Sequence, residues 1–416
     1  MKSKARVIKA LNHEEPDRVP VGEWGVDHDI VEKAIGHPTF WRAKASTTKA
    51  LWDGRRDEVV ESFKEDIVDL VEKLDHDLVP VHLVPPADYQ PPEIEKIGPN
   101  SWEEPNGRVW KYSEGNDAIL PVDEPMPEVE NEEDLVEYFE NTVVPRCGFK
   151  IKSKSSGDYD LELDDESRLE LIDYVVDKIG DEKFVFARGF EEAVGSPDPL
   201  FYSEFESISL FFGINSEEYL KAIFKRPEMA KKAMSLYSKL AKRMTEIFID
   251  AGVDGVMPQG DFADGTGPMI NPESIREIFY PSMEEICEIG HDRGVKVLTH
   301  NCGNNWKLLD LFVEAGFDAW QSIEVKSAGM DLDKLVEEYG EELTFWGGID
   351  LNALVSGEPD QVRESVRESL EVAGPGGGLI LGTSNSVAYG SNYKNYMAAL
   401  ETLRKHGNYP ISNTLG

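Results

Sequence analysis

The chain is poor in cysteine and has no long apolar run, and both absences narrow its class. Its 416 residues include only three cysteines, Cys147, Cys287 and Cys302. This number is too small for a disulfide framework and favours a reducing compartment. No stretch approaches the roughly 18 consecutive apolar residues of a membrane-spanning helix. No continuous apolar segment follows the N-terminal residues, so we expect no secretory signal and a cytoplasmic location.

Positive charge is also scarce relative to negative charge. The 43 lysines and arginines face 80 aspartates and glutamates, giving a formal net charge of −37. Such a surface repels phosphate groups, so neither nucleic acid nor a membrane surface is expected as a partner. The acidic residues are spread along the whole chain, which favours a solvated acidic surface suited to high salt. An electrostatic footprint for a basic partner is the alternative.

Strand-like and helical patterns alternate along most of the chain. Eight short apolar stretches lie near residues 20, 80, 185, 255, 297, 319, 345 and 380, with helical patterns between them. Such units fit an α/β fold of the closed (β/α)8 TIM-barrel type better than an open sheet. The glycine-rich phosphate-binding pattern of doubly wound folds does not follow the first stretch. We therefore predict a single barrel domain over residues 1–416.

The regular alternation is interrupted between about residues 85 and 157. Prolines are dense there, and Asn106-Gly107 between Trp102 and Trp110 predicts a type I′ hairpin. A short acidic helix is expected over Glu132–Tyr138. We interpret this region as an excursion, a β-hairpin and an acidic helix inserted on the barrel. A small separate domain is the alternative.

One strand runs directly into a polar tip that carries an imidazole and a thiol. Val295–Leu298 is β-branched and apolar, as a buried parallel strand should be, and His300 and Cys302 follow it. Side chains two residues apart on extended backbone point to the same face. An imidazole and a thiolate together are well suited to zinc. The alternative is a packed histidine beside an inert cysteine, and so short a spacing does not decide between them.

Other polar residues also fall at predicted strand ends, where the active site of a barrel lies. For Asp261 we expect a catalytic role as proton acceptor, although it could also bind a metal or orient His300. Substrate binding is expected of four further residues, Arg188, Gln259, Gln321 and Asn385. A structural salt bridge is the alternative role for Arg188. Asp264 could serve as a carboxylate in the same ways as Asp261, and capping of their loop is the alternative role for both.

Several stretches together resemble the uroporphyrinogen decarboxylase superfamily, specifically its methyltransferase-like branch. They are Arg6–Pro20, Asn271–Glu273 with Tyr280-Pro281, Thr299–Gly303, Ala328–Leu332, Phe345–Asp350 and Gly377–Gly382. They span nearly the whole chain, and the resemblance implies a (β/α)8 fold.

The branch determines the expected activity. The decarboxylases of haem synthesis carry an arginine-containing N-terminal segment that binds porphyrin carboxylates, whereas Val21–Gly25 here has no arginine pair. The corrinoid-linked branch resembles the chain better. That resemblance implies methyl transfer between a corrinoid protein and a small-molecule donor or acceptor. It also implies zinc held by a His-x-Cys pair, matched by His300 and Cys302, and by a later cysteine.

The sequence departs from this pattern at the third ligand. No cysteine follows Cys302, and the expected position falls near Ser384-Asn385. Either a carboxylate such as Asp261 or Glu23 completes the site, or metal binding has been altered. The resemblance then implies a methyltransferase acting on a methoxylated or methylated-amine substrate, with zinc and a partner-bound corrinoid. A tetrapyrrole decarboxylase and a non-catalytic barrel that binds a corrinoid protein are the alternatives, and a homo-oligomer is compatible with either.

Overall fold

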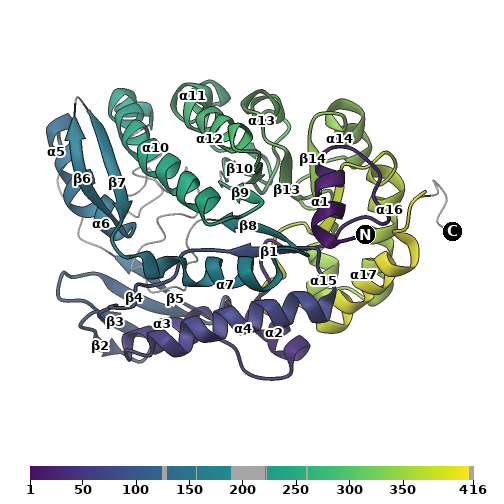
Figure 1. Ribbon diagram of the computed structural model, residues 1–416, viewed down its shortest axis with the longest axis horizontal. Helices are drawn as coiled ribbons and strands as arrows, with labels where there is room; N and C mark the ends of the chain where they lie inside the picture. Colours follow the sequence, from purple (N-terminus) through teal and green to yellow (C-terminus); the bar gives the residue numbers. More distant parts are fainter. Residues whose placement is uncertain (124–128, 156, 189–220, 222, 259–260, 412–416) are drawn as a thin grey trace.

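Seven parallel strands form one curled sheet, in the order β1-β8-β9-β12-β13-β14-β15 (Figure 1). The computed structural model describes the chain except for residues 124–128, 156, 189–220, 222, 259–260 and 412–416. The strands are β1 (Leu78–Val81), β8 (Phe184–Arg188), β9 (Gly255–Met257), β12 (Lys296–His300), β13 (Ala319–Ile323), β14 (Thr344–Ile349) and β15 (Leu379–Thr383). They are buried almost throughout, as parallel strands covered on both faces should be.

The N-terminal segment of residues 19–26 closes the sheet between its last and first strands. The N–H of Leu381 donates to the Pro20 carbonyl at 2.8 Å, and the N–H of Gly22 donates back to Leu381 at 3.1 Å. On the other side, the N–H of Asp77 donates to Val21 at 2.6 Å. The segment pairs through isolated bridges because Pro20 has no N–H to give. The predicted eight-part barrel is thus confirmed, with its first strand reduced to bridges.

Helices alternate with the strands and surround the sheet (Figure 1). They are α1 (Ser3–Leu11), α2 (His28–Ile35), α3 (Lys44–Trp52), α4 (Arg56–Leu74), η2 (Glu166–Leu169), α7 (Glu170–Ile179), α10 (Pro227–Asp250), α11 (Pro272–Ile278), α12 (Tyr280–Asp292), α13 (Leu309–Ala315), α14 (Leu332–Tyr339), α15 (Leu351–Ser356), α16 (Pro359–Ala373) and α17 (Tyr393–His406). The sequence also shows a helical pattern at about residues 207–224, and most of it lies outside the described residues. Within the described part of the chain, no helix has the length and apolar character to cross a bilayer.

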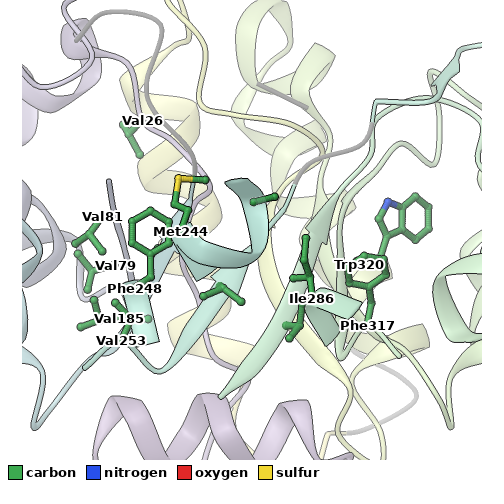
Figure 2. Close-up of a cluster of buried hydrophobic side chains, with 14 of the residues drawn as sticks. Val26, Val79, Val81, Val185, Met244, Phe248, Val253, Ile286, Phe317 and Trp320 are labelled. Atoms are coloured by element: carbon green, nitrogen blue, oxygen red, sulfur yellow. The ribbon is translucent and has the colours of Figure 1, made fainter. Parts of the chain in front are cut away.

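Alternate strand residues feed two separate cores, because successive side chains of a strand point to opposite faces. Leu78, Phe184 and Phe186 point into the barrel, where Val7 and Leu11 of α1 pack against the same cluster. Their neighbours point outward to the helices. Figure 2 shows this outer layer, in which Val79, Val81, Val185 and Val253 lie with Phe248 and Met244 of α10. Helix α1 therefore plugs one end of the barrel and leaves the carboxyl ends of the strands for the site.

The predicted excursion exists and is larger than expected. It contains a four-stranded antiparallel sheet, a helical segment and a second hairpin. Its elements are β2 (Glu95–Gly98), β3 (Ser101–Glu103), β4 (Val109–Ser113), β5 (Ala118–Asp123), α5 (Glu132–Tyr138), η1 (Phe139–Val143), α6 (Val144–Arg146), β6 (Phe149–Ser155) and β7 (Asp158–Leu163). The predicted hairpin is the β3–β4 turn, but its predicted type I′ geometry is wrong: Gly107 has a positive φ of 89° and Asn106 does not, and the N–H of Gly107 donates to the Glu104 carbonyl at 2.9 Å. The predicted acidic helix is α5. Because the excursion follows the carboxyl end of β1, it lies on the site side, with β5 against α3 and β7 against α10.

A buried charge cluster ties the start of the chain to the barrel. The Asp77 carboxylate is fully buried and accepts hydrogen bonds from Arg6 at 2.6 Å, from Arg18 at 2.7 Å and from the N–H of Val21 at 2.9 Å. Arg6 also donates to Asp17. The cluster therefore fixes α1, the closing segment and the start of β1 relative to one another.

Replacing Asp77 with Asn should destabilise the protein by about 3 kcal/mol, because two guanidinium groups would lose their buried counter-charge. Urea unfolding monitored by circular dichroism measures the change. Asp75→Asn is the matched control: its carboxylate also pairs with Arg18, but the side chain is 57% exposed. That change should cost less than about 1 kcal/mol. Equal losses in the two variants would contradict a special role for Asp77.

A second buried carboxyl, that of Glu23, joins the closing segment to the last strand. Its Oε2 accepts hydrogen bonds from the backbone N–H and the hydroxyl of Thr383, at 2.9 and 2.7 Å. Burial raises the pKa of Glu23 to about 7, and the two Thr383 hydrogen bonds oppose that rise only in part. A carboxyl with a raised pKa in the folded state stabilises the fold below its unfolded pKa and loses that contribution as the pH rises.

Glu23→Gln should therefore remove part of the pH dependence of stability. Relative to the variant, the natural protein should lose about 3 kcal/mol of unfolding free energy as the pH rises from below 4.5 to above 7, since each pKa unit corresponds to about 1.4 kcal/mol. Urea unfolding of both proteins from pH 4 to pH 8 measures the difference. Parallel stability curves would contradict burial of a protonated carboxyl.

Candidate metal centre

The tip after β12 holds His300 and Cys302 in a tightly bonded turn. Gly303 has a φ of 86°, and a Cβ there would lie 2.6 Å from the carbonyl oxygen of Asp264, so only glycine fits. The Asn305 side-chain amide donates to three carbonyl oxygens of the turn at 3.0 to 3.1 Å. The turn is therefore fixed by its own backbone geometry and by the neighbouring loop.

Asp261 joins the predicted pair from the loop after β9. The ligand atoms of Asp261, His300 and Cys302 all lie within 4.8 Å of one another. The Oδ1 atom of Asp261 lies 3.5 Å from His300 Nε2 and accepts the backbone N–H of Cys302 at 3.1 Å. Asp261 itself has a φ of 43°, a left-handed conformation that short polar side chains tolerate. The imidazole and the thiol thus meet as their spacing predicts, and a carboxylate completes the group.

The hydrogen bonds of Gln321 determine which nitrogen of His300 is available. The Gln321 amide donates to the carbonyl oxygens of Thr383 at 3.3 Å and Asn385 at 2.9 Å. Its Oε1 therefore faces His300 Nδ1 and accepts the ring proton in a short hydrogen bond. This leaves the lone pair of Nε2 directed toward Asp261, as a metal-binding imidazole requires.

The environment of Cys302 opposes its ionisation in the absence of a cation. Burial raises the pKa of the Cys302 thiol well above its usual range, and the negative charges of Asp261 and Glu324 add to the rise. Glu324 also accepts the N–H of Gly303 at 3.0 Å. A cation among these groups would invert this balance and favour the thiolate. The sequence did not single out Glu324, because one glutamate after a strand carries no signal among 80 acidic residues.

Trp24 covers one face of the histidine. Its ring stacks on His300 with centroids 4.9 Å apart, and the guanidinium groups of Arg188 and Arg42 lie 4.6 and 5.1 Å from the Trp24 ring centre. Arg42 is paired with Asp27 at 2.6 Å. The side chain of Arg188, buried at the end of β8, is thus brought near the centre through Trp24.

The remaining predicted substrate-binding residues have mixed positions. The three hydrogen bonds of Gln321 give it an orienting role, while the Asn385 side chain accepts the N–H of Ser386 at 2.8 Å. Gln259 lies outside the described residues. Contact of substrate with Arg188, Gln259, Gln321 or Asn385 stays a prediction.

Two positions considered for the third ligand are engaged elsewhere. The Glu23 carboxyl is bonded to Thr383. The Ser384 hydroxyl accepts the N–H of Leu351 at 3.2 Å. Asp264 caps its own loop by accepting from Thr266, as its alternative interpretation had it. Among the described residues, Asp261 is therefore the side chain placed to act as third donor.

The three donors form a chemically coherent set. One imidazole nitrogen, one thiol sulfur and one carboxylate oxygen match the ligand types of zinc, and three protein ligands leave the fourth position for substrate or water. The group lies at the carboxyl ends of β9 and β12, the face where barrel enzymes act. The residues present therefore fit a catalytic zinc-type ion.

The comparisons with known proteins agree with this fold. A solved methyltransferase from Methanosarcina mazei superposes with a TM-score of 0.63 at 15% identity, covering 97% of this chain and 99% of that one. A chitinase from Chromobacterium violaceum (TM-score 0.33, 11% identity, 58% of this chain and 86% of that one) and a sugar phosphate isomerase/epimerase from Parabacteroides distasonis (0.27, 11%, 59% and 93%) overlap too weakly to support an argument. No curated protein matches the chain.

A family model matches the part of the chain that contains the candidate metal centre. The model of uroporphyrinogen decarboxylase (URO-D) matches residues 213–406, a range that includes Asp261, His300 and Cys302. The whole-chain likeness to the methyltransferase shows the same barrel. The family match over residues 213–406 agrees with the resemblance of the sequence stretches described above to the uroporphyrinogen decarboxylase superfamily.

Proposed function

We propose that this protein is a corrinoid-protein-linked methyltransferase that uses a zinc-type ion. It moves a methyl group from a methoxylated or methylated-amine substrate to a corrinoid protein, or from that protein to an acceptor. The observation that carries the proposal is the meeting of Asp261, His300 and Cys302 at the site face of a barrel of this superfamily. An ether or amine is a poor methyl donor, and a bound Lewis acid is what such a substrate needs.

Each residue around the centre has a distinct task in this proposal. His300, Cys302 and Asp261 would hold the ion, which when bound polarises the substrate heteroatom. Gln321 keeps the Nδ1 proton of His300 in place, so that Nε2 stays available. Arg188 supplies positive charge that could pair with an anionic group of the substrate. The chain thus contributes position and polarisation, whereas the hard chemistry belongs to the corrinoid.

The geometry also indicates where a corrinoid protein would approach. The centre lies at the carboxyl ends of the strands, and α1 plugs the opposite end of the barrel. The excursion lies toward the end of the barrel away from α1 (Figure 1). A partner must therefore dock on this face, beside the excursion, to bring its cofactor close to Cys302.

The ligand set is tested by metal content. The purified protein should contain about one zinc per chain, and Cys302→Ser should lose it because a hydroxyl replaces the thiolate. Asp261→Asn should weaken zinc binding at least tenfold, roughly as loss of a supporting ligand does. Elemental analysis and chelator competition measure both. Cys287→Ser is the control, because Cys287 is buried in α12, and it should retain the metal. Metal retained by Cys302→Ser would refute the assignment.

Methyl transfer is tested directly with a reduced corrinoid protein. Methylation of the corrinoid, followed by its visible absorption, should appear with at least one member of a panel of methoxylated aromatics and methylated amines. Cys302→Ser should reduce the rate at least a hundredfold, since the polarising group would be absent. Conversion of uroporphyrinogen by metal-free protein would overturn the proposal in favour of a decarboxylase. Corrinoid-protein binding without transfer from any donor would favour a non-catalytic barrel.

A further inference from the structure

Two adjacent residues of the closing segment lie on opposite sides of the barrel wall. Trp24 points into the barrel, where its ring covers His300. Glu23 points outward, toward Thr383 of β15 and Tyr396 of α17. The closing segment therefore contacts both the metal centre and the layer between sheet and helices. A change in the outer layer at Glu23 acts on the same short piece of backbone that holds Trp24 against His300.

A second connection leads from Glu23 to His300 through hydrogen bonds. Thr383 donates twice to Glu23, and the Thr383 carbonyl oxygen accepts from the side chain of Gln321. Gln321 in turn accepts the Nδ1 proton of His300. Both the covered ring face of His300 and its Nδ1 atom thus depend on groups anchored at residues 23 and 24. Linked hydrogen bonds of this kind polarise one another in a dry interior.

On the side away from the metal centre, Glu23 meets a buried tyrosine and a buried histidine. The Tyr396 hydroxyl interacts with the Glu23 carboxyl and lies 2.8 Å from Nε2 of His76. The Glu23 side chain is 3% exposed, and its Oε1 has no direct hydrogen-bond partner among the described residues. An orphan oxygen at this depth is costly for a carboxylate and suits a carboxyl that carries a proton there.

Glu23, Tyr396 and His76 form a line of three buried polar groups. Of these three, only Glu23 changes its protonation state near neutral pH. Burial, with help from the neighbouring cations Lys183, Arg404 and Arg18, lowers the pKa of His76 to about 3, against the opposing charge of Asp75. Burial and Glu23 raise the pKa of Tyr396 well above its usual range, against the opposing charge of Arg404. His76 and Tyr396 are therefore neutral across the range in which Glu23 gains or loses its proton.

Loss of that proton must reverse the hydrogen bonds along the line. With Glu23 protonated, a small movement of its carboxyl O–H toward Tyr396 lets it donate to the Tyr396 oxygen, and the Tyr396 hydroxyl can then donate to His76 Nε2. With Glu23 ionised, Tyr396 must donate to the carboxylate instead. Nε2 of His76 must then carry the ring proton to donate to Tyr396. The tautomer of His76 therefore reports on the protonation state of Glu23.

We propose that Glu23 is a positioning residue for the metal centre, whose protonation state is transmitted to His300 through Thr383 and Gln321 and to His76 through Tyr396. The part of the inference that concerns His300 rests on the proposed function, whereas the part that concerns His76 does not. Ionised Glu23 accepts stronger hydrogen bonds from Thr383 than neutral Glu23 does. That change tightens the support behind Gln321, and support of this kind alters the affinity of a site for its metal.

The metal half is tested with Co²⁺, which reports ligand geometry through its visible spectrum. Between pH 6 and pH 8 the ratio of Co²⁺ dissociation constants of Glu23→Gln and the natural protein should change by up to about tenfold. Both dissociation constants depend on pH because Cys302 releases a proton when it binds the metal. This shared pH dependence cancels in the ratio. The Co²⁺ spectrum of the natural protein should shift with a midpoint near pH 7, and that of the variant should not.

Asp29→Asn is the matched control. Burial also raises the pKa of Asp29, which lies in α2 and is bonded to the N–H of Gly390 rather than to Thr383. This variant should keep the spectral shift of the natural protein. A shift that persists in Glu23→Gln, or one that disappears in Asp29→Asn, overturns the assignment to Glu23.

The second half is tested on metal-free protein by nitrogen NMR of the histidine rings. The signal of His76, assigned by its loss in His76→Gln, should move from a ring protonated at Nδ1 to one protonated at Nε2 as the pH rises through 7. In Glu23→Gln it should not move. A protein that binds no metal yet shows the tautomer change would refute the proposed function and leave the line itself standing. A fixed tautomer in the natural protein refutes the line.

Discussion

The backbone hydrogen bonds of residues 19–26 complete the barrel, and the metal centre depends on that closure. The segment is held by Leu381 on one side and Asp77 on the other, with few bonds because Pro20 cannot donate. Side chains compensate for the sparse pairing: Asp77 anchors Val21 and two arginines, and Glu23 anchors Thr383. A barrel closed in this way places Trp24 against His300 as a direct result of its topology.

Two buried carboxyls, those of Asp77 and Glu23, differ in whether their hydrogen-bond partners carry positive charge. The Asp77 carboxylate is fully buried and is satisfied by two guanidinium groups and an N–H, which offset the cost of burying it. Glu23 is equally buried but faces only neutral donors, and its pKa rises to about 7. The two carboxyls have the same depth and different partners. The partners therefore distinguish the carboxyl that anchors two arginines from the carboxyl whose pKa is raised.

Much of the fold could be predicted because its signals are local. The β-branched runs locate the strands, and the spacing of His300 and Cys302 places both on one face because extended backbone alternates. Helix breaks were harder to predict. The sequence suggests one helix from Asn271 to about Gly290, but α11 ends at Ile278 and α12 begins at Tyr280, where Pro281 offers no N–H. The second hairpin of the excursion was missed because the lysines of β6 hide its alternation.

The site was only partly predictable, since its partners come from distant segments. Asp261 could be placed near the pair by strand order, but its choice over Glu23 depends on which way each side chain faces. Trp24 and Glu23 are neighbours in sequence, and the opposite sides of the wall follow from the alternation of extended backbone. Glu324 and Gln321 act by hydrogen bonds to the tip and the imidazole. Such roles are properties of the assembled barrel and leave no pattern in the sequence.

In the proposed metal centre a carboxylate, that of Asp261, stands in for the second cysteine ligand, and this exchange would suit the proposed substrates. A thiolate and a carboxylate each carry one negative charge, so a divalent ion held by Cys302, Asp261 and neutral His300 is balanced, as it would be with two thiolates. A carboxylate oxygen is a harder and less electron-releasing donor than a thiolate sulfur. An ion in this set therefore retains more Lewis acidity, which favours polarising an ether oxygen or an amine nitrogen over activating a thiol. Within the proposed function, the departure from the two-cysteine pattern thus favours the methyl-donor side of the reaction.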